Sequence, residues 1–275
     1  MKRMFRFLYR IIGKIEKNSQ KAFEGKKAFV VIGFQRSGTS MVCDMLNRAG
    51  VYFGDSKELM APDSRNPNGF FEHKRLFKLC RKFLKESGKT MDYNFNFGKQ
   101  LKAEGYANRF SRFFTRISIM NILSAVSSKK EVFGIKSFPI FWYFVKPYFP
   151  KERTVIAVFR NPFSVATSFE TAWPGRFNVS QVIHFWTTAH KDMIFHLSAE
   201  KNFVLISYED LLDIEKRKNI VQKISEISGL DSSKLESVFD DKLNRSGGRA
   251  SRLKETYPLP EETEKVLASL EKMKI

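Results

Sequence analysis

The residues best suited to chemistry lie in a short loop that follows an apolar run. Residues 28–34 read Ala-Phe-Val-Val-Ile-Gly-Phe, and the pattern Gly-x-x-x-x-Gly spans Gly33–Gly38. Such a loop, when a helix follows it, surrounds an oxyanion with backbone N–H groups and the positive end of the helix dipole. Thr39 occupies the position of the nucleotide triphosphatase lysine, and Arg36 lies within the loop. The pattern predicts a phosphate held by arginine and hydroxyls, without the magnesium that a lysine-bearing loop uses.

A second junction between an apolar run and a helix carries another arginine. Residues 154–159 are apolar, Arg160 follows them, and Pro162 suits the first turn of a helix. Ser168 falls two turns into that helix, on the side that faces the end of the run. A guanidinium offers phosphate a forked, charge-assisted pair, and a hydroxyl adds a hydrogen bond. Two cradles of this kind predict one ligand that is phosphorylated at two places.

Four runs rich in β-branched and aromatic residues predict the strands that position these loops: 28–34, 132–137, 154–159 and 203–207. They are almost continuously apolar, as expected for a parallel sheet covered on both faces. Helical patterns alternate with them over residues 39–49, 74–87, 106–127, 162–172, 179–200, 214–228 and 261–274. This alternation predicts a three-layer α/β fold, a central and mainly parallel sheet flanked by helices, with ligands at the carboxyl ends of the strands.

The rest of the chain predicts loops and one N-terminal helix. Residues 54–69 and 244–252 are polar stretches that we expect to be loops. Residues 1–27 alternate bases with apolar residues and predict a basic amphipathic helix, which either contacts an anionic membrane or packs on its own domain. No apolar run there approaches the roughly 20 residues of a membrane span. We expect residues 28–275 to form a single domain.

The composition favours anionic partners. Lys plus Arg number 48 against 29 Asp plus Glu, a formal net charge of +19 over 275 residues. Nucleotides, nucleic acid, acidic glycans or an anionic membrane suit such a surface, and a merely solvated lysine-rich surface is the alternative. Cys43 and Cys80 share no metal or redox spacing, which predicts buried free thiols and a reducing, cytoplasmic location. The four histidines offer no metal pair, and we expect no metal.

The two phosphate motifs together resemble the sulfotransferase superfamily, which uses 3′-phosphoadenosine 5′-phosphosulfate (PAPS). In that family the first loop, often Arg-x-Gly-Thr/Ser, binds the 5′-phosphosulfate, and a strand-Arg-x-Pro-(five residues)-Ser element binds the 3′-phosphate. The resemblance implies a P-loop-like fold, PAPS as sulfuryl donor, 3′,5′-ADP as product and no metal. The residues that it assigns to the nucleotide are Gln35, Arg36, Ser37, Gly38, Thr39, Ser40, Arg160 and Ser168.

Other segments extend the resemblance over most of the chain. Residues 204–211, Val-Leu-Ile-Ser-Tyr-Glu-Asp-Leu, resemble the family's late strand and Tyr-Glu-Asp-Leu segment, of which we treat Tyr208 and Glu209 as structural. The pair Phe185-Trp186 resembles its Trp-bearing helix. Residues 66–72, Asn-Pro-Asn-Gly-Phe-Phe-Glu, resemble the Asn-Pro-x-Gly-Phe/Tyr-x-Glu stretch of a bacterial and carbohydrate-type branch.

Two motifs depart from the family. Residues 134–139 resemble the Gly-x-Lys-x-Pro element of that branch but lack the Asp and Arg of its commoner Lys-Asp-Pro-Arg form. The Arg-Lys-Gly-x-x-Gly motif of the cytosolic branch is not reproduced. Arg245 and Arg249 flank Gly247 and Gly248, and these residues either bind the nucleotide in its place or form a surface turn.

The resemblance implies in-line transfer of SO3 from the 5′-phosphosulfate to an acceptor hydroxyl, by analogy with loose phosphoryl transfer. Arg36 and residues 37–40 suit neutralisation of the departing phosphate. Glu72 is our first choice as base, because it lies at a loop-to-helix junction, and the adjacent His73 is the second. Glu72 could instead serve only the helix dipole, and His73 could point at solvent. Lys136 either reaches the leaving bridge oxygen or lies at the surface.

The acceptor is the least constrained partner. The carbohydrate-type resemblance and the basic surface favour a hydroxyl on a glycan or glycolipid, while tyrosine, small phenols and lipids stay open. A P-loop kinase or nucleotide phosphotransferase is the first rival function and predicts dependence on ATP and magnesium. A nonenzymatic polyanion binder is the second and predicts broad, salt-sensitive affinity. Nothing in the motifs points to a specific nucleic acid.

Overall fold

The computed structural model describes residues 13–14, 17–18, 21–64, 66, 69–86, 109–238 and 247–275. Within these residues, four strands form one all-parallel sheet in the order β2-β1-β3-β4. The strands are β1 (Lys27–Gly33), β2 (Val132–Ser137), β3 (Thr154–Phe159) and β4 (Phe203–Ser207). They match the four predicted apolar runs to within one residue at each end, and the prediction of a parallel central sheet is confirmed.

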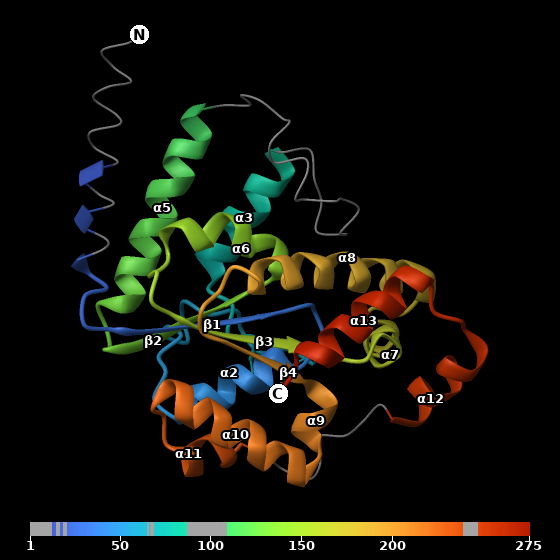
Figure 1. Ribbon diagram of the computed structural model, residues 1–275. Coiled ribbons are helices and arrows are strands. Elements are labelled where there is room, and N and C mark those ends of the chain that lie inside the picture. The colour runs from blue at the N-terminus through green and yellow to red at the C-terminus, as the bar shows by residue number, and fades with distance from the viewer. Residues whose placement is uncertain are drawn as a thin grey trace.

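Helices cover both faces of this sheet, which gives the three predicted layers (Figure 1). One face packs against α3 (Lys74–Glu86), α5 (Arg109–Ser127), α6 (Pro139–Val145), α7 (Pro162–Ala172), α8 (Val179–Leu197) and α13 (Glu261–Met273). The other packs against α2 (Thr39–Arg48), α9 (Tyr208–Leu212), α10 (Ile214–Ser228) and α11 (Ser232–Glu236). The 3₁₀ turn η1 (Lys146–Tyr148) follows α6, and α12 (Gly247–Thr256) packs on α7.

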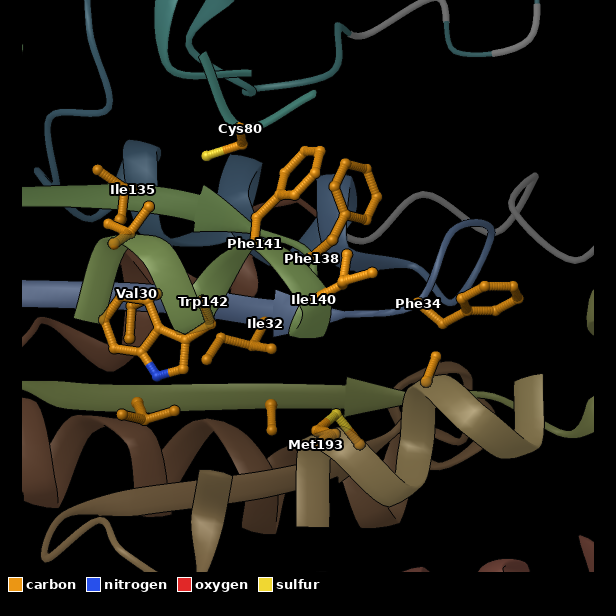
Figure 2. Packing of buried hydrophobic residues seen from close by; sticks show 14 of the residues in the cluster. Val30, Ile32, Phe34, Cys80, Ile135, Phe138, Ile140, Phe141, Trp142 and Met193 are labelled. Atoms are coloured by element: carbon orange, nitrogen blue, oxygen red, sulfur yellow. The ribbon is translucent and has the colours of Figure 1, made fainter. Parts of the chain in front are cut away.

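The apolar runs are continuous because each strand supplies two cores. Successive strand side chains point to opposite faces, so Val30 and Ile32 of β1 enter one core while Phe29 and Val31 enter the other. Figure 2 shows the first core, where Val30 and Ile32 lie close to the fully buried Trp142 of α6. Both faces of the sheet are therefore sealed, and the loops at its carboxyl edge are left to bind ligands.

The prediction that residues 244–252 form a loop is wrong for the residues that the structure describes. There α12 begins at Gly247 and continues to Thr256. Ala250 is buried against Phe163 of α7 and Ile183 of α8. Gly247 and Gly248 favour a turn and have poor helix propensity, but they occupy only the first two positions of α12. The packing of Ala250 stabilises the helix and outweighs this local preference. Residues 244–246 lie outside the described residues.

The structure tests the prediction for the cysteines but only part of the prediction for the N-terminal segment. Cys43 and Cys80 are buried free thiols, as predicted. Of the predicted N-terminal helix only residues 13–14, 17–18 and 21–27 are described, and membrane contact by this segment stays a prediction. No helix in the described part of the chain is long and apolar enough to cross a bilayer.

Candidate functional site

The loop between β1 and α2 depends on the two glycines that bound it. A Cβ atom on Gly33 would lie 2.5 Å from Thr39 Cγ2 and 2.6 Å from the carbonyl oxygen of Val158. Gly38 has a φ of 88°, and a Cβ atom there would lie 2.0 Å from a ring carbon of Tyr208. Only glycine lets the backbone approach its neighbours this closely. The Gly-x-x-x-x-Gly pattern is therefore a packing requirement of the loop.

The same loop has unused capacity to bind an anion. The N–H groups of Thr39 and Ser40 precede the first helical hydrogen bond, which Met41 N–H donates to the Gly38 carbonyl, and they carry the positive end of the helix dipole. Ser37, just before them, is fully buried, yet its Oγ has no hydrogen-bond partner. A buried hydroxyl without a partner costs about 1–3 kcal/mol. A phosphate oxygen would supply the acceptor that this hydroxyl lacks.

The two predicted phosphate cradles meet in the structure. Arg36 Nε donates to Ser168 Oγ at 2.9 Å, and Arg160 Nη1 donates to the backbone oxygen of Arg36 at 3.3 Å. They meet because β1 and β3 pair in parallel, which brings their carboxyl ends to one edge of the sheet. We call Arg36, Arg160 and Ser168 the arginine side of the loop. It is one continuous cluster and not two separate pockets.

Residues that the sequence marked as structural hold Arg160 in place. Its guanidinium carbon lies 4.5 Å from the centre of the Tyr208 ring, and its Nε lies 3.9 Å from Glu209 Oε1. Glu209 also accepts from the backbone N–H of Asn161 at 3.1 Å. Trp186 Nε1 donates to the backbone oxygen of Arg160 at 2.9 Å. The Tyr-Glu-Asp-Leu segment and the Trp-bearing helix thus position the arginine side.

A second cluster, which we call the lysine side, lies at the start of α2 and comprises Ser40, Glu72 and Lys136. Lys136 is buried and does not lie at the surface. Its Nζ donates to Ser40 Oγ at 2.7 Å and to the backbone oxygen of Phe70 at 2.7 Å, and lies 3.1 Å from Glu72 Oε1. The register that pairs Val31 of β1 with Lys136 of β2 brings the lysine to this position.

Ser40 is left with a proton to donate. Asn66 Nδ2 donates to Ser40 Oγ at 2.8 Å, in addition to the bond from Lys136. A hydroxyl has two acceptor lone pairs and one O–H. Because the two donors occupy the lone pairs, the O–H of Ser40 is directed to an acceptor such as a phosphate oxygen. Asn66 also bonds the backbone oxygen of Gly69, which ties the loop before Glu72 to α2.

Glu72 is buried and only half paired. Its Oε1 faces Lys136, while its Oε2 has no hydrogen-bond partner. The preceding residue, Phe71, has a φ of 62°, a conformation that costs about 1–3 kcal/mol in a residue other than glycine and that clusters at functional sites. The Phe71 ring packs edge-on against Phe53 at 5.7 Å, and Met60 N–H donates to the Glu72 carbonyl at 2.9 Å. These contacts hold the strained turn that presents Glu72.

His73 lies beside Glu72 and is buried, so it does not point at solvent. Its Nδ1 has no hydrogen-bond partner, and burial lowers the pKa of the ring. Glu72, His73, Lys136 and Ser137 line one small cavity of about 10 Å³, room for roughly one water molecule. Two unpaired proton acceptors, Glu72 Oε2 and His73 Nδ1, therefore belong to residues of one pocket next to the phosphate loop.

The structure does not place most of the remaining predicted residues at the site or away from it. Arg245 lies outside the described residues, and so does the side chain of Arg249; Gly248 lies in the first turn of α12. Gln35 is half buried beside Arg36. In the part of the chain that the structure describes, no group of three His, Cys, Asp or Glu side chains could hold a metal ion. The sequence missed Asn66 as a site residue, although it begins the Asn-Pro-x-Gly motif.

No family model and no curated protein matches this sequence. Solved structures match by fold, and the first is a sulfotransferase domain from the curacin biosynthetic pathway (TM-score 0.52, 16% identity, 90% of this chain and 98% of that chain). A sulfotransferase domain from the Synechococcus PCC 7002 olefin synthase matches with a TM-score of 0.53 at 16% identity, over 90% of this chain and 94% of the other. Sulfotransferase STF1 from Mycobacterium tuberculosis H37Rv matches with a TM-score of 0.53 at 13% identity, over 93% and 81%. The chain shares the fold of these sulfotransferase domains, which is the fold that the motifs predict.

Proposed function

We propose that this protein is a PAPS-dependent sulfotransferase that transfers a sulfuryl group to an acceptor hydroxyl. The observation that carries the proposal is the position of the phosphate loop between two different clusters. The arginine side offers guanidinium groups and a hydroxyl, and the lysine side offers a buried cation and a half-paired carboxylate. A donor phosphorylated at two places would bind to the loop and the arginine side. The lysine side would then carry out the transfer to the acceptor.

The residues present fit the donor nucleotide. Ser37 Oγ lacks a partner, the O–H of Ser40 is left to donate, and the N–H groups of Thr39 and Ser40 precede the first helical hydrogen bond. These groups would hold the 5′-phosphosulfate, and Arg160 with Ser168 would hold the 3′-phosphate. When bound, PAPS supplies the sulfuryl group. Arg36 donates to Ser168 in this structure, whereas Lys136 donates to Ser40 at the start of α2. Lys136 is therefore the cation next to the proposed position of the 5′-phosphosulfate.

Glu72 is the proposed base. Its Oε2 is free to accept the proton of the acceptor hydroxyl, and its ion pair with Lys136 holds the carboxylate next to Ser40. The charge of Lys136 also stabilises the negative charge that develops on the leaving phosphate. His73 is the second candidate, because burial lowers its pKa and leaves the ring neutral and able to accept a proton.

From the sequence motifs alone the expected acceptor is a hydroxyl on a carbohydrate or glycolipid, and the lining of the pocket, considered below, revises this expectation. From the buried free thiols we expect the enzyme to act in the cytoplasm. Contact of residues 1–27 with an anionic membrane is a further proposal that rests on their composition alone. Labelled PAPS incubated with the purified protein and cell-envelope fractions would identify the acceptor.

Thermal stabilisation tests the proposed donor. At about 100 times its dissociation constant, a ligand that binds only the folded protein adds about 2.7 kcal/mol. We expect 3′,5′-ADP to raise the melting temperature more than 5′-AMP or ATP with magnesium does, because only the bisphosphate spans the loop and the arginine side. Stronger stabilisation by ATP with magnesium would favour a kinase. Equal, salt-sensitive stabilisation by any polyanion would favour a nonenzymatic binder.

A further inference from the structure

We propose that the acceptor pocket beside Glu72 takes an alcohol whose hydroxyl is attached directly to an apolar chain or ring, in preference to a free sugar. This inference rests on the proposed function, since it concerns the acceptor of the same site. It follows from the pocket lining and from the few hydrogen-bonding groups that the pocket has left to offer.

The apolar part of the pocket comes from α3, from α6 and from the junction that precedes α6. The six apolar lining residues are Leu76, Phe77, Cys80, Phe138, Phe141 and Val145. Figure 2 shows the side chains of Phe138 and Phe141 next to each other, with Cys80 of α3 beside Phe141. Burial raises the pKa of the Cys80 thiol to about 12, so this side chain is a neutral part of the wall. Transfer of an apolar group from water to such a lining is favourable, because the group gives up no hydrogen bonds with water.

Three of the lining residues are phenylalanines whose rings pack against one another. Phe77 packs edge-on against Phe141 at 5.5 Å and against Phe138 at 6.0 Å, and Phe138 packs edge-on against Phe141 at 5.4 Å. Phe138 and Phe141 are buried, whereas Phe77 is only half buried. The cavity now has room for about one water molecule. An apolar acceptor therefore needs the pocket to widen, and Phe77 is the least buried of the three rings.

The polar groups of the pocket can serve about one hydroxyl. Lys136 Nζ has three donors, and Ser40, Phe70 and Glu72 engage them. Ser137 Oγ donates to the backbone oxygen of Phe138 at 3.2 Å. Glu72 Oε2 and His73 Nδ1 are left without partners. A free sugar would bury several hydroxyls against these few groups, and each one left unpaired lowers its kcat/KM about tenfold to a hundredfold.

The transfer balances with the groups at hand. The acceptor oxygen forms the new O–S bond, the bridging S–O bond to the 5′-phosphate breaks, the proton goes to Glu72 Oε2, and 3′,5′-ADP leaves. A single hydroxyl near the carboxylate is all that this step requires of the acceptor. The rest of the acceptor lies against the aromatic wall.

Transfer from labelled PAPS to straight-chain primary alcohols from butanol to octanol, with glucose as the polar control, tests the inference. We expect kcat/KM to rise about fourfold for each added methylene, as burial of that group predicts, and glucose to be the poorest acceptor. A flat series, or glucose as good as octanol, would overturn it. Stabilisation by 3′,5′-ADP is measured in the same samples. Without that stabilisation the proposed function fails as well, whereas stabilisation with a flat series defeats only the inference about the acceptor.

Substitutions in the apolar wall of the pocket provide a second test of the inference. Phe77→Asn should remove most of the dependence on chain length, while the matched Phe77→Leu should keep it. The affinity for 3′,5′-ADP should be unchanged in both, because the Phe77 ring packs on Phe138, Phe141 and Arg81. Should Phe77→Asn fail to fold, Cys80→Ser adds a hydroxyl to the wall at nearly equal volume and should lower kcat/KM for octanol severalfold. Equal dependence on chain length in Phe77→Asn and Phe77→Leu, or an unaltered Cys80→Ser, would contradict the proposed role of the wall.

Discussion

The two sides of the β1–α2 loop are built differently, although both bring cations to the same helix start. On the arginine side, Arg36 donates to Ser168 and accepts from Arg160, and Arg160 also packs against Tyr208 and Glu209. On the lysine side, a buried ion pair follows a strained turn and leaves one carboxylate oxygen without a partner. Cations held by several neighbouring residues suit binding, whereas a buried carboxylate oxygen without a partner suits proton transfer. We infer that the arginine side binds the donor and the lysine side performs the chemistry.

Glu72→Gln tests this division most severely. The amide keeps the shape of the side chain but cannot accept a proton as the carboxylate does, so we expect kcat to fall about 10²–10⁴-fold. The affinity for 3′,5′-ADP, measured by calorimetric titration, should change little. A fully active variant would remove Glu72 from the role of base.

Lys136→Met should affect both the chemistry and the stability. Loss of the cation removes stabilisation of the leaving phosphate, which should cost about 10²–10³ in kcat. It also leaves Glu72 buried without its partner, and breaking a buried pair in this way costs about 3–5 kcal/mol of unfolding free energy.

The double variant Lys136→Met with Glu72→Gln is the matched control for that loss of stability. It should recover much of the free energy of unfolding, because no uncompensated charge is left. Additive losses in urea denaturation would show that the two side chains do not interact as described.

Gly38→Ala tests the packing of the loop between the two sides. A Cβ atom there meets the Tyr208 ring in addition to the backbone strain at a φ of 88°, so we expect a loss of about 2–4 kcal/mol in unfolding free energy. Gly50→Ala is the control, since Gly50 has a φ of 101° with no atom within 4 Å of the added Cβ. It should lose less, about 1–2 kcal/mol, because only the backbone strain is added there. Equal losses in the two variants would mean that contact with Tyr208 is unimportant.

Arg160→Ala tests the arginine side as a binding element. Without one charge-assisted pair, the affinity for 3′,5′-ADP should fall about tenfold to a hundredfold. Adenosine 5′-phosphosulfate, which lacks the 3′-phosphate, should bind the variant almost as well as the original protein. A similar loss for both nucleotides would place Arg160 at the 5′-phosphate.

His73→Gln is expected to have the smallest effect. Burial lowers the pKa of His73, so its ring stays neutral as the pH rises through the neutral range and contributes no change of charge there. We expect kcat to stay within a few-fold of the original value, with the same pH profile. Loss of activity as large as that of Glu72→Gln would instead make His73 the base.

The sequence predicted the arginine side better than the lysine side. Arg36, Arg160 and Ser168 follow local signals, an apolar run and then a helix start, and parallel pairing of neighbouring strands is enough to bring them together. Lys136 and Glu72 are 64 residues apart, and their contact depends on the register of β2 against β1 and on the left-handed turn at Phe71. Neither is encoded in a short motif, so the burial of Lys136 could not be foreseen. The helix α12 was missed for a similar reason, because its packing on α7 outweighs a local turn signal.

A crystal structure with 3′,5′-ADP tests the central claim most directly. We predict the 5′-phosphate at the first turn of α2, within hydrogen-bonding reach of Ser37 and Ser40, and the 3′-phosphate on Arg160 and Ser168. The nucleotide would then span the loop and leave Glu72 and Lys136 facing the acceptor pocket. A bisphosphate bound away from Arg160, or with its adenosine in the pocket beside Glu72, would contradict the account.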